Sequence, residues 1–92
     1  MIQKTFVISN RLGLHARPAS LFVKTTSRFT SSVKILRDGQ EIDGKSIMGL
    51  LMLAAGPGTE LTIVANGSDE AAVIAAVEDL FNRRFDDDIE GD

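Results

Sequence analysis

The stretch SVKILRDGQEI, residues 32–42, contains the pattern that decides the fold. Val33 and Ile35 alternate with polar residues, which is typical of a strand with one buried face. Asp38-Gly39 is a strong signal for a two-residue hairpin turn, so the residues on its two sides are expected to pair in antiparallel fashion. The predicted strands span residues 32–37 and 40–42.

The flanking sequence alternates between strand and helix periodicity. The expected elements are a strand over 2–8, a helix that starts just after His15, a short helix over 47–53, a strand over 60–66 and a last helix capped by Ser68. The order β-α-β-β-α-β-α predicts an α+β fold, an open-faced β-sandwich in which three helices cover one face of a four-stranded antiparallel sheet. The expected core residues are Ile2, Phe6, Ile8, Ala19, Phe22, Val23, Thr26, Leu50, Leu53, Leu61, Ile63, Ala65, Val73, Val77, Leu80 and Phe81.

Length and composition predict one ordinary globular domain. The chain has 92 residues, of which 43% are hydrophobic and 25% charged, with no Cys and one His. We expect a domain over residues 1–85 and a frayed acidic tail over 86–92. The absence of Cys excludes disulfides and thiolate chemistry, and we expect no metal site and no cofactor. No long apolar run or signal-peptide pattern occurs, so we expect no membrane insertion and a cytoplasmic location.

The net charge of -3 hides an uneven distribution. Five of the 13 acidic residues lie within residues 86–92, whereas residues 1–85 carry 10 basic and 8 acidic side chains. Residues 11–28 contain Arg11, Arg17, Lys24 and Arg28 and no acid. Such a local positive field attracts an anion or an acidic protein surface. Nucleic acid is not expected as a partner, because no basic stripe with stacking aromatics is present.

His15 is the candidate reactive residue. As the N-cap of the first helix it would stand beside the backbone N–H groups of Ala16 and Arg17, and a helix N-terminus is a ready anion site. The Arg17 guanidinium adds donors that grip phosphate oxygens, while Pro18 fixes the first turn. A neutral imidazole can accept a phosphoryl group at neutral pH. No carboxylate lies near His15 in the sequence, so a catalytic triad is not indicated, and no Walker-type loop is present. The pattern therefore predicts a phosphoryl carrier rather than a turnover enzyme.

The predicted helix over residues 47–53 has no polar face, and its apolar side chains cannot all be buried in so small a domain. Leu50 and Leu53 are the expected core contacts, and the remaining apolar residues are expected to face a partner. Leu21 on the first helix is expected to be exposed among cations. We define the docking patch as Leu21, Ile47, Met48, Leu51 and Met52, and we expect Arg17, Lys24 and Lys45 to surround it.

Two segments resemble one protein family. Residues 13–19, GLHARPA, resemble the active-site motif of HPr, the histidine-containing phosphocarrier family of the bacterial phosphotransferase system. Residues 44–49, GKSIMG, resemble the regulatory serine segment of that family. The resemblance implies that His15 takes a phosphoryl group on Nδ1 from phosphorylated enzyme I and passes it to an enzyme II A-domain, with Arg17 on the phosphate. It also implies that an ATP-dependent HPr kinase/phosphorylase modifies Ser46, and the family fold agrees with the element order above.

Several alternatives stay open from the sequence. Residues 80–86, LFNRRFD, look more like the nitrogen-branch phosphocarriers than the sugar-transport type. The chain could also be a non-catalytic interaction module of a nitrogen-type branch in which His15 is incidental, and Ser46 could be a structural N-cap alone. A small hydrolase with His15 as base is disfavoured by the missing carboxylate partner. We expect a monomer.

Overall fold

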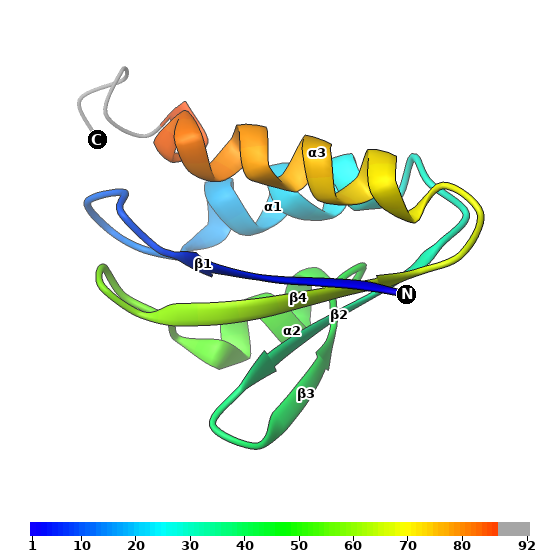
Figure 1. The fold of residues 1–92 in the computed structure, drawn as a ribbon. Helices are drawn as coiled ribbons and strands as arrows, with labels where there is room; N and C mark the ends of the chain where they lie inside the picture. Colours follow the sequence, from blue (N-terminus) through cyan, green and yellow to red (C-terminus); the bar gives the residue numbers. More distant parts are fainter. Residues whose placement is uncertain (87–92) are drawn as a thin grey trace.

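A computed structural model describes residues 1–86, and residues 87–92, most of the expected tail, lie outside the described residues (Figure 1). The helices and strands follow one another in the predicted order. They are β1 (Ile2–Val7), α1 (Ala16–Thr26), β2 (Ser32–Arg37), β3 (Gln40–Asp43), α2 (Ile47–Leu53), β4 (Glu60–Asn66), α3 (Glu70–Asn82) and a short 3₁₀ helix, η1 (Arg84–Asp86).

The sheet is antiparallel throughout, with the strand order β1-β4-β2-β3. The predicted hairpin is confirmed: Arg37 pairs with Gln40 across the turn, and Asp38 and Gly39 both have positive φ, as a tight hairpin turn requires. β4, which is the last strand in the sequence, lies between β1 and β2 in the sheet. Because β4 pairs with both β1 and β2, it joins segments that are distant in the sequence into one sheet.

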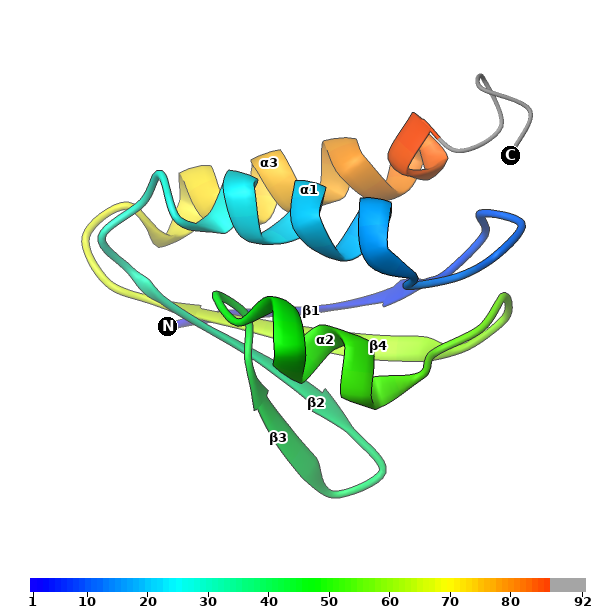
Figure 2. The same ribbon diagram turned by 180° about the vertical axis from the view of Figure 1, so that it is seen from behind.

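Three helices cover one face of this sheet, which confirms the predicted open-faced sandwich. α1 and α3 lie side by side, and α2 lies near β2 and β3 (Figure 2). Gly49 allows α2 to approach β3 closely, because a Cβ atom there would lie 2.7 Å from Ile42 Cγ2. Of the expected core residues, Ile2 and Val23 are only partly buried and pack at the margin of the core.

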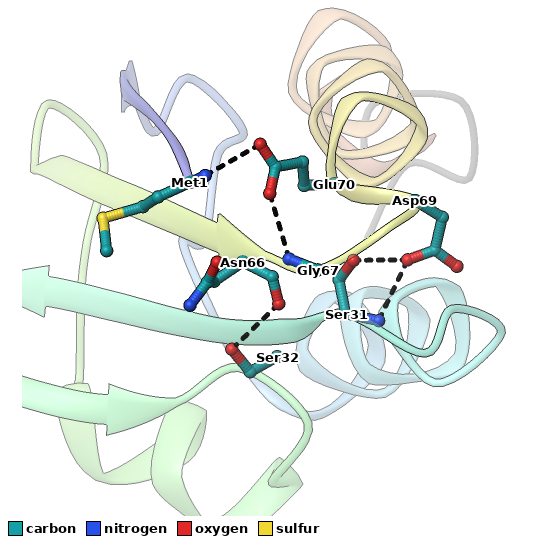
Figure 3. Close-up of polar contacts among 7 residues, drawn as sticks. All are labelled: Met1, Ser31, Ser32, Asn66, Gly67, Asp69 and Glu70. Atoms are coloured by element: carbon teal, nitrogen blue, oxygen red, sulfur yellow. Dashed lines mark hydrogen bonds and ion pairs between the residues drawn. The ribbon is translucent and has the colours of Figure 1, made fainter.

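The N-terminus of α3 differs from the prediction in its capping residue. Ser68 is exposed, and Asp69 is the N-cap without a side-chain capping bond. The Asp69 carboxylate instead accepts hydrogen bonds from Ser31 Oγ and from the Ser31 backbone N–H at 2.9 Å (Figure 3). It also accepts from the Thr30 backbone N–H at 3.0 Å. Asp69 therefore fixes the start of β2 against α3, a long-range contact that helix-capping rules do not predict.

Glu70 completes this junction. Its Oε1 accepts from the Gly67 backbone N–H at 3.0 Å, and its Oε2 pairs with the terminal ammonium of Met1 at 2.9 Å (Figure 3). Both contacts lower the pKa of Glu70 from its ordinary value, the Gly67 bond being the stronger cause. The first turn of α3 thus holds the loop before it and the first residue of the chain.

We expect acid to weaken this junction selectively. The hydrogen bonds from Ser31 Oγ and then the Thr30 backbone N–H lower the pKa of Asp69 from 3.8 to about 2. Because the pKa is lower in the folded state, this contribution to stability is complete above about pH 4 and is lost as the pH falls toward 2. Urea unfolding of the native protein and of Asp69→Asn should show a stability difference at neutral pH that shrinks over this range. A difference independent of pH would exclude the carboxylate as its source.

The end of the described chain is anchored by aromatic packing. Phe81 stacks on Phe6 with ring centroids 4.8 Å apart, and Phe85 meets the edge of Phe81 at 5.0 Å. Asp86, which the sequence places in the tail, lies within η1 and pairs with Arg83 Nη1 at 2.9 Å. Within residues 1–86, no helix has the length and apolar character needed to cross a membrane.

Candidate functional site

His15 is the N-cap of α1, as the sequence predicts. Its backbone is extended (φ -95°, ψ -168°), its carbonyl accepts from Ala19 N–H at 3.0 Å, and its side chain makes no capping hydrogen bond. The residue is half-buried. The backbone carbonyl of His15 therefore accepts the first hydrogen bond of α1, whereas its imidazole does not cap the helix.

The loop before His15 is held against the segment that follows α2. Leu14 N–H donates to the Ala55 carbonyl at 2.9 Å, and the buried Asn10 donates from Nδ2 to the Gly13 carbonyl at 2.7 Å. Gly13 has φ +70°, and a Cβ atom there would lie 2.3 Å from Ala55 O. Only glycine fits this crossing of two backbones, so Gly13 and Asn10 position His15.

The first turn of α1 contains the groups that the sequence predicts for anion binding. Ala16 and Arg17 are exposed, Pro18 is buried, and the turn contains no acidic side chain. First-turn N–H groups have no partner within their own helix, and the N-terminus carries a partial positive charge. The predicted acceptor, the guanidinium and the helix N-terminus are thus within three consecutive residues.

Ser46 is confirmed as the N-cap of α2. Its Oγ accepts from Gly49 N–H at 3.0 Å. Thr26 Oγ1, at the last residue of α1, donates to the Gly44 carbonyl at 2.8 Å. Since His15 begins α1 and Ser46 lies beside the end of α1, the two residues are separated by about the length of that helix, ~16 Å for 11 residues.

Lys45 also lies at the far end of α1 from His15. Its Nζ donates to the Phe29 carbonyl at 2.9 Å, and the side chain is half-buried. Arg17 and Lys24 thus lie on α1, whereas Lys45 directly precedes Ser46, the N-cap of α2.

The docking patch is mostly exposed, as predicted for α2. Met48 and Met52 are 67% and 75% exposed, and Ile47 and Leu51 are also exposed. Leu21 is the exception: it is partly buried and packs against the core, and it lines the same hollow as Phe85. Leu12, which the sequence pattern did not single out, is 54% exposed just before Gly13. Its apolar side chain in a loop next to the only His was the available signal.

Comparison with known proteins agrees with this geometry. The family described as "PTS HPr component phosphorylation site" matches residues 2–83. The phosphocarrier protein HPr of Treponema pallidum is 46% identical over 88 residues, covering 96% of this chain and all of that protein. The crystal structure of HPr from Thermoanaerobacter tengcongensis has a TM-score of 0.89 and 41% identity, covering 92% of this chain and 96% of that one.

A further solved structure differs in assembly. Crh, the catabolite repression protein of Bacillus subtilis, has a TM-score of 0.64 and 43% identity, covering 86% of this chain and 95% of that one, and is described as a domain-swapped dimer. The likeness spans nearly the whole chain in each case, and the resemblance expected from residues 13–19 and 44–49 is confirmed. A match over residues 2–83, together with relatives above 40% identity, shows that this chain belongs to the HPr family of phosphocarriers of the phosphotransferase system.

Proposed function

We propose that this chain carries a phosphoryl group on His15, which it accepts from phosphorylated enzyme I and passes to an enzyme II A-domain. The observation that carries the proposal is the placement of the one imidazole at the N-terminus of α1 without a capping role. The ring nitrogen lone pair forms the new P–N bond as the donor's bond to phosphorus breaks. Each chain carries one group at a time, so the protein acts as a stoichiometric carrier and not as a turnover enzyme.

The surroundings of His15 stabilise the transferred group. The Arg17 guanidinium supplies charge-assisted hydrogen bonds to phosphoryl oxygens, and the backbone N–H groups of Ala16 and Arg17 supply further donors. The positive end of α1 favours the added negative charge. Partners would bury the docking patch and orient on Arg17 and Lys24.

The test is incubation of the purified chain with phosphoenolpyruvate and enzyme I. We expect one acid-labile, base-stable phosphate per chain, which then moves to an A-domain acceptor. Acceptors of the sugar type and of the nitrogen type, assayed in parallel, identify the branch. Binding to enzyme I without incorporation of phosphate would favour the alternative of an interaction module.

Arg17→Ala is expected to slow phosphoryl transfer about tenfold to a hundredfold. A hydrogen bond to a charged group contributes roughly 1.5–3 kcal/mol, and its loss falls on the transfer step. Arg17 is exposed, so the free energy of unfolding should change little. The matched control is Arg28→Ala, which removes the same charge past the other end of α1. Rapid-quench measurement of the two variants separates a local role from the loss of one positive charge, and equal rates would contradict a role for Arg17.

We further propose that Ser46 is a phosphorylation site for an HPr kinase/phosphorylase and that the added charge acts on docking. A phosphate at the N-terminus of α2 suits the helix dipole, so the fold should be retained. It would lie at the margin of the docking patch and repel an acidic enzyme I surface. Phosphorylation at Ser46 would then slow phosphoryl transfer to His15 without contact between the two residues.

Ser46→Asp is the corresponding variant, with Ser46→Asn as its uncharged control. Asp and Asn cap helices about as well as Ser, so both melting temperatures should stay close to that of the native protein. We expect Ser46→Asp alone to weaken binding to enzyme I at low salt, by about two- to fivefold, since one exposed charge pair is worth ~0.2–1 kcal/mol. The deficit should shrink in high salt. Equal weakening in Ser46→Asn, or loss of α2 in Ser46→Asp, would show that Ser46 is chiefly a structural cap.

We propose that the carrier works as a monomer in the cytoplasm, where the family's phosphoryl donor is found. His15, Arg17 and the docking patch all belong to one chain, so the site needs no second copy to be complete. Light scattering at assay concentration tests this against a dimer of the kind described for Crh.

A further inference from the structure

Two of the three methionines of the chain lie on the exposed face of α2. Met48 and Met52 are 67% and 75% exposed, and their i, i+4 spacing places both side chains on one face of the helix, one turn apart. The buried face of α2 is formed by Leu50 and Leu53, and the helix packs on α1 and β3 (Figure 2). The two thioether side chains thus lie outside the packing that holds α2 in place.

The composition of the chain makes these sulfurs the principal targets of a mild oxidant. The sequence has no Cys, Trp or Tyr, so the thiols that would react with peroxide first are absent. The Met thioether is oxidised to a sulfoxide, which methionine sulfoxide reductases reduce again. The third methionine, Met1, is 75% exposed, but its ammonium pairs with Glu70 and it lies outside the docking patch. Oxidation within the docking patch would therefore fall on Met48 and Met52.

Such oxidation would change the chemistry of the docking patch without unfolding α2. It converts an apolar side chain into one with a polar sulfoxide oxygen. All α2 residues of the patch are apolar, so a partner surface that matches them leaves the new oxygen without a hydrogen-bond donor. The Ser46 cap and the core contacts of Leu50 and Leu53 involve neither sulfur, so the fold should be retained.

We propose that Met48 and Met52 are reversible oxidation sites, which take an oxygen atom from a peroxide and thereby weaken the docking patch. A lone pair of the Met sulfur attacks one oxygen of hydrogen peroxide, so that the S–O bond forms, the O–O bond breaks and water leaves. The sulfur is oxidised and the peroxide is reduced by the same electron pair. In the reverse step a dithiol of a reductase removes the oxygen as water and becomes a disulfide.

The oxidation itself is independent of the proposed function, whereas its consequence for docking to enzyme I rests on the proposed function. The first measurement is therefore the rate of sulfoxide formation at each methionine in hydrogen peroxide, followed by peptide mass spectrometry. We expect Met48 and Met52 to react in the folded protein at nearly the rate of the urea-unfolded chain, because unfolding exposes them little further. Sulfoxide that appears only as the protein unfolds would overturn the assignment of these sites.

The second measurement is the affinity for enzyme I, made after the peroxide has been removed so that enzyme I is not itself oxidised. The oxidised chain should bind roughly five- to hundredfold more weakly, as expected for burying a polar group without a partner. Treatment with the two methionine sulfoxide reductases, one for each sulfoxide epimer, should restore the affinity. The melting temperature should stay at its value before oxidation.

The matched variant is Met48→Leu with Met52→Leu, which keeps the patch apolar at similar volume and retains Met1 as an internal control. Its affinity for enzyme I should not change on peroxide treatment. Equal weakening in this variant would place the effect on Met1 or on another residue and would overturn the proposal. Complete oxidation of the native chain without weaker binding would do the same.

Two further outcomes separate the parts of the proposal. A lower melting temperature after oxidation, or weaker binding that the reductases do not reverse, would contradict a reversible change confined to the docking patch. If the untreated chain neither binds enzyme I nor accepts phosphate, the proposed function and the docking consequence fail together. The sulfoxide yields then still decide whether Met48 and Met52 are sites of oxidation.

Discussion

Replacing His15 with alanine is expected to abolish phosphoryl uptake from phosphoenolpyruvate and enzyme I. His15 is the one imidazole in the chain, so no other side chain of this kind can take its place. The variant should fold normally, because the side chain makes no capping hydrogen bond at the start of α1. Since His15 is half-buried, we expect the free energy of unfolding to change by no more than about 1 kcal/mol. The measurement is incorporation of acid-labile phosphate, with urea unfolding as the check on the fold.

The two readouts together make the result decisive. Loss of incorporation in a protein that unfolds with the native midpoint assigns the reaction to the imidazole. Labelling equal to that of the native protein would place the phosphate on another residue, and the account of the α1 N-terminus would then be wrong.

Gly13→Ala is expected to have the largest effect on stability near the site. A non-glycine residue in the left-handed conformation costs about 1–2 kcal/mol, and Gly13 has φ +70°. The new Cβ would also lie 2.3 Å from Ala55 O, so the bond from Leu14 N–H to that oxygen must lengthen or break, which costs about 1 kcal/mol more. The loop that carries His15 would move, and transfer should slow together with the loss of stability.

The control for this variant is Gly39→Ala. Gly39 has φ +83°, but a Cβ atom there meets nothing within 4 Å, and it lies in the β2–β3 turn. The Gly39→Ala variant therefore has the energetic cost of a left-handed backbone conformation, but its Cβ atom does not clash with another backbone segment. Unfolding measurements on the pair should therefore show a greater loss for Gly13→Ala, and only that variant should slow transfer. Equal losses would mean that the crossing of the two backbones does not position His15.

The parts of the fold that local chemistry determines could be predicted from the sequence. The Asp38-Gly39 turn, the Ser46 cap and the start of α1 after His15 each depend on a few neighbouring residues, and the structure confirms all three. The alternation of Val33 and Ile35 likewise identifies the buried face of β2. His15 could be recognised because its N-cap position and the guanidinium of Arg17 lie within three consecutive residues of the sequence.

The features that escaped prediction arise from contacts between distant segments. Asp69 reads as an acid suited to a helix N-terminus, but its carboxylate accepts hydrogen bonds from Ser31 and Thr30, which precede it in the chain by 38 and 39 positions. Leu21 reads as exposed among cations, but it is partly buried and packs against the core. Periodicity determines the face of an element and carries no information on which distant residue covers that face.

The central claim, that the phosphoryl group is carried on the imidazole of His15, is tested most directly by nitrogen NMR of the phosphorylated chain. A protein labelled with ¹⁵N at histidine gives signals from one ring only, so the assignment is unambiguous. We predict that phosphoenolpyruvate and enzyme I shift the Nδ1 signal and give it coupling to phosphorus, and that an acceptor A-domain reverses the change. Phosphate incorporation that leaves both ring-nitrogen signals unchanged would contradict the account.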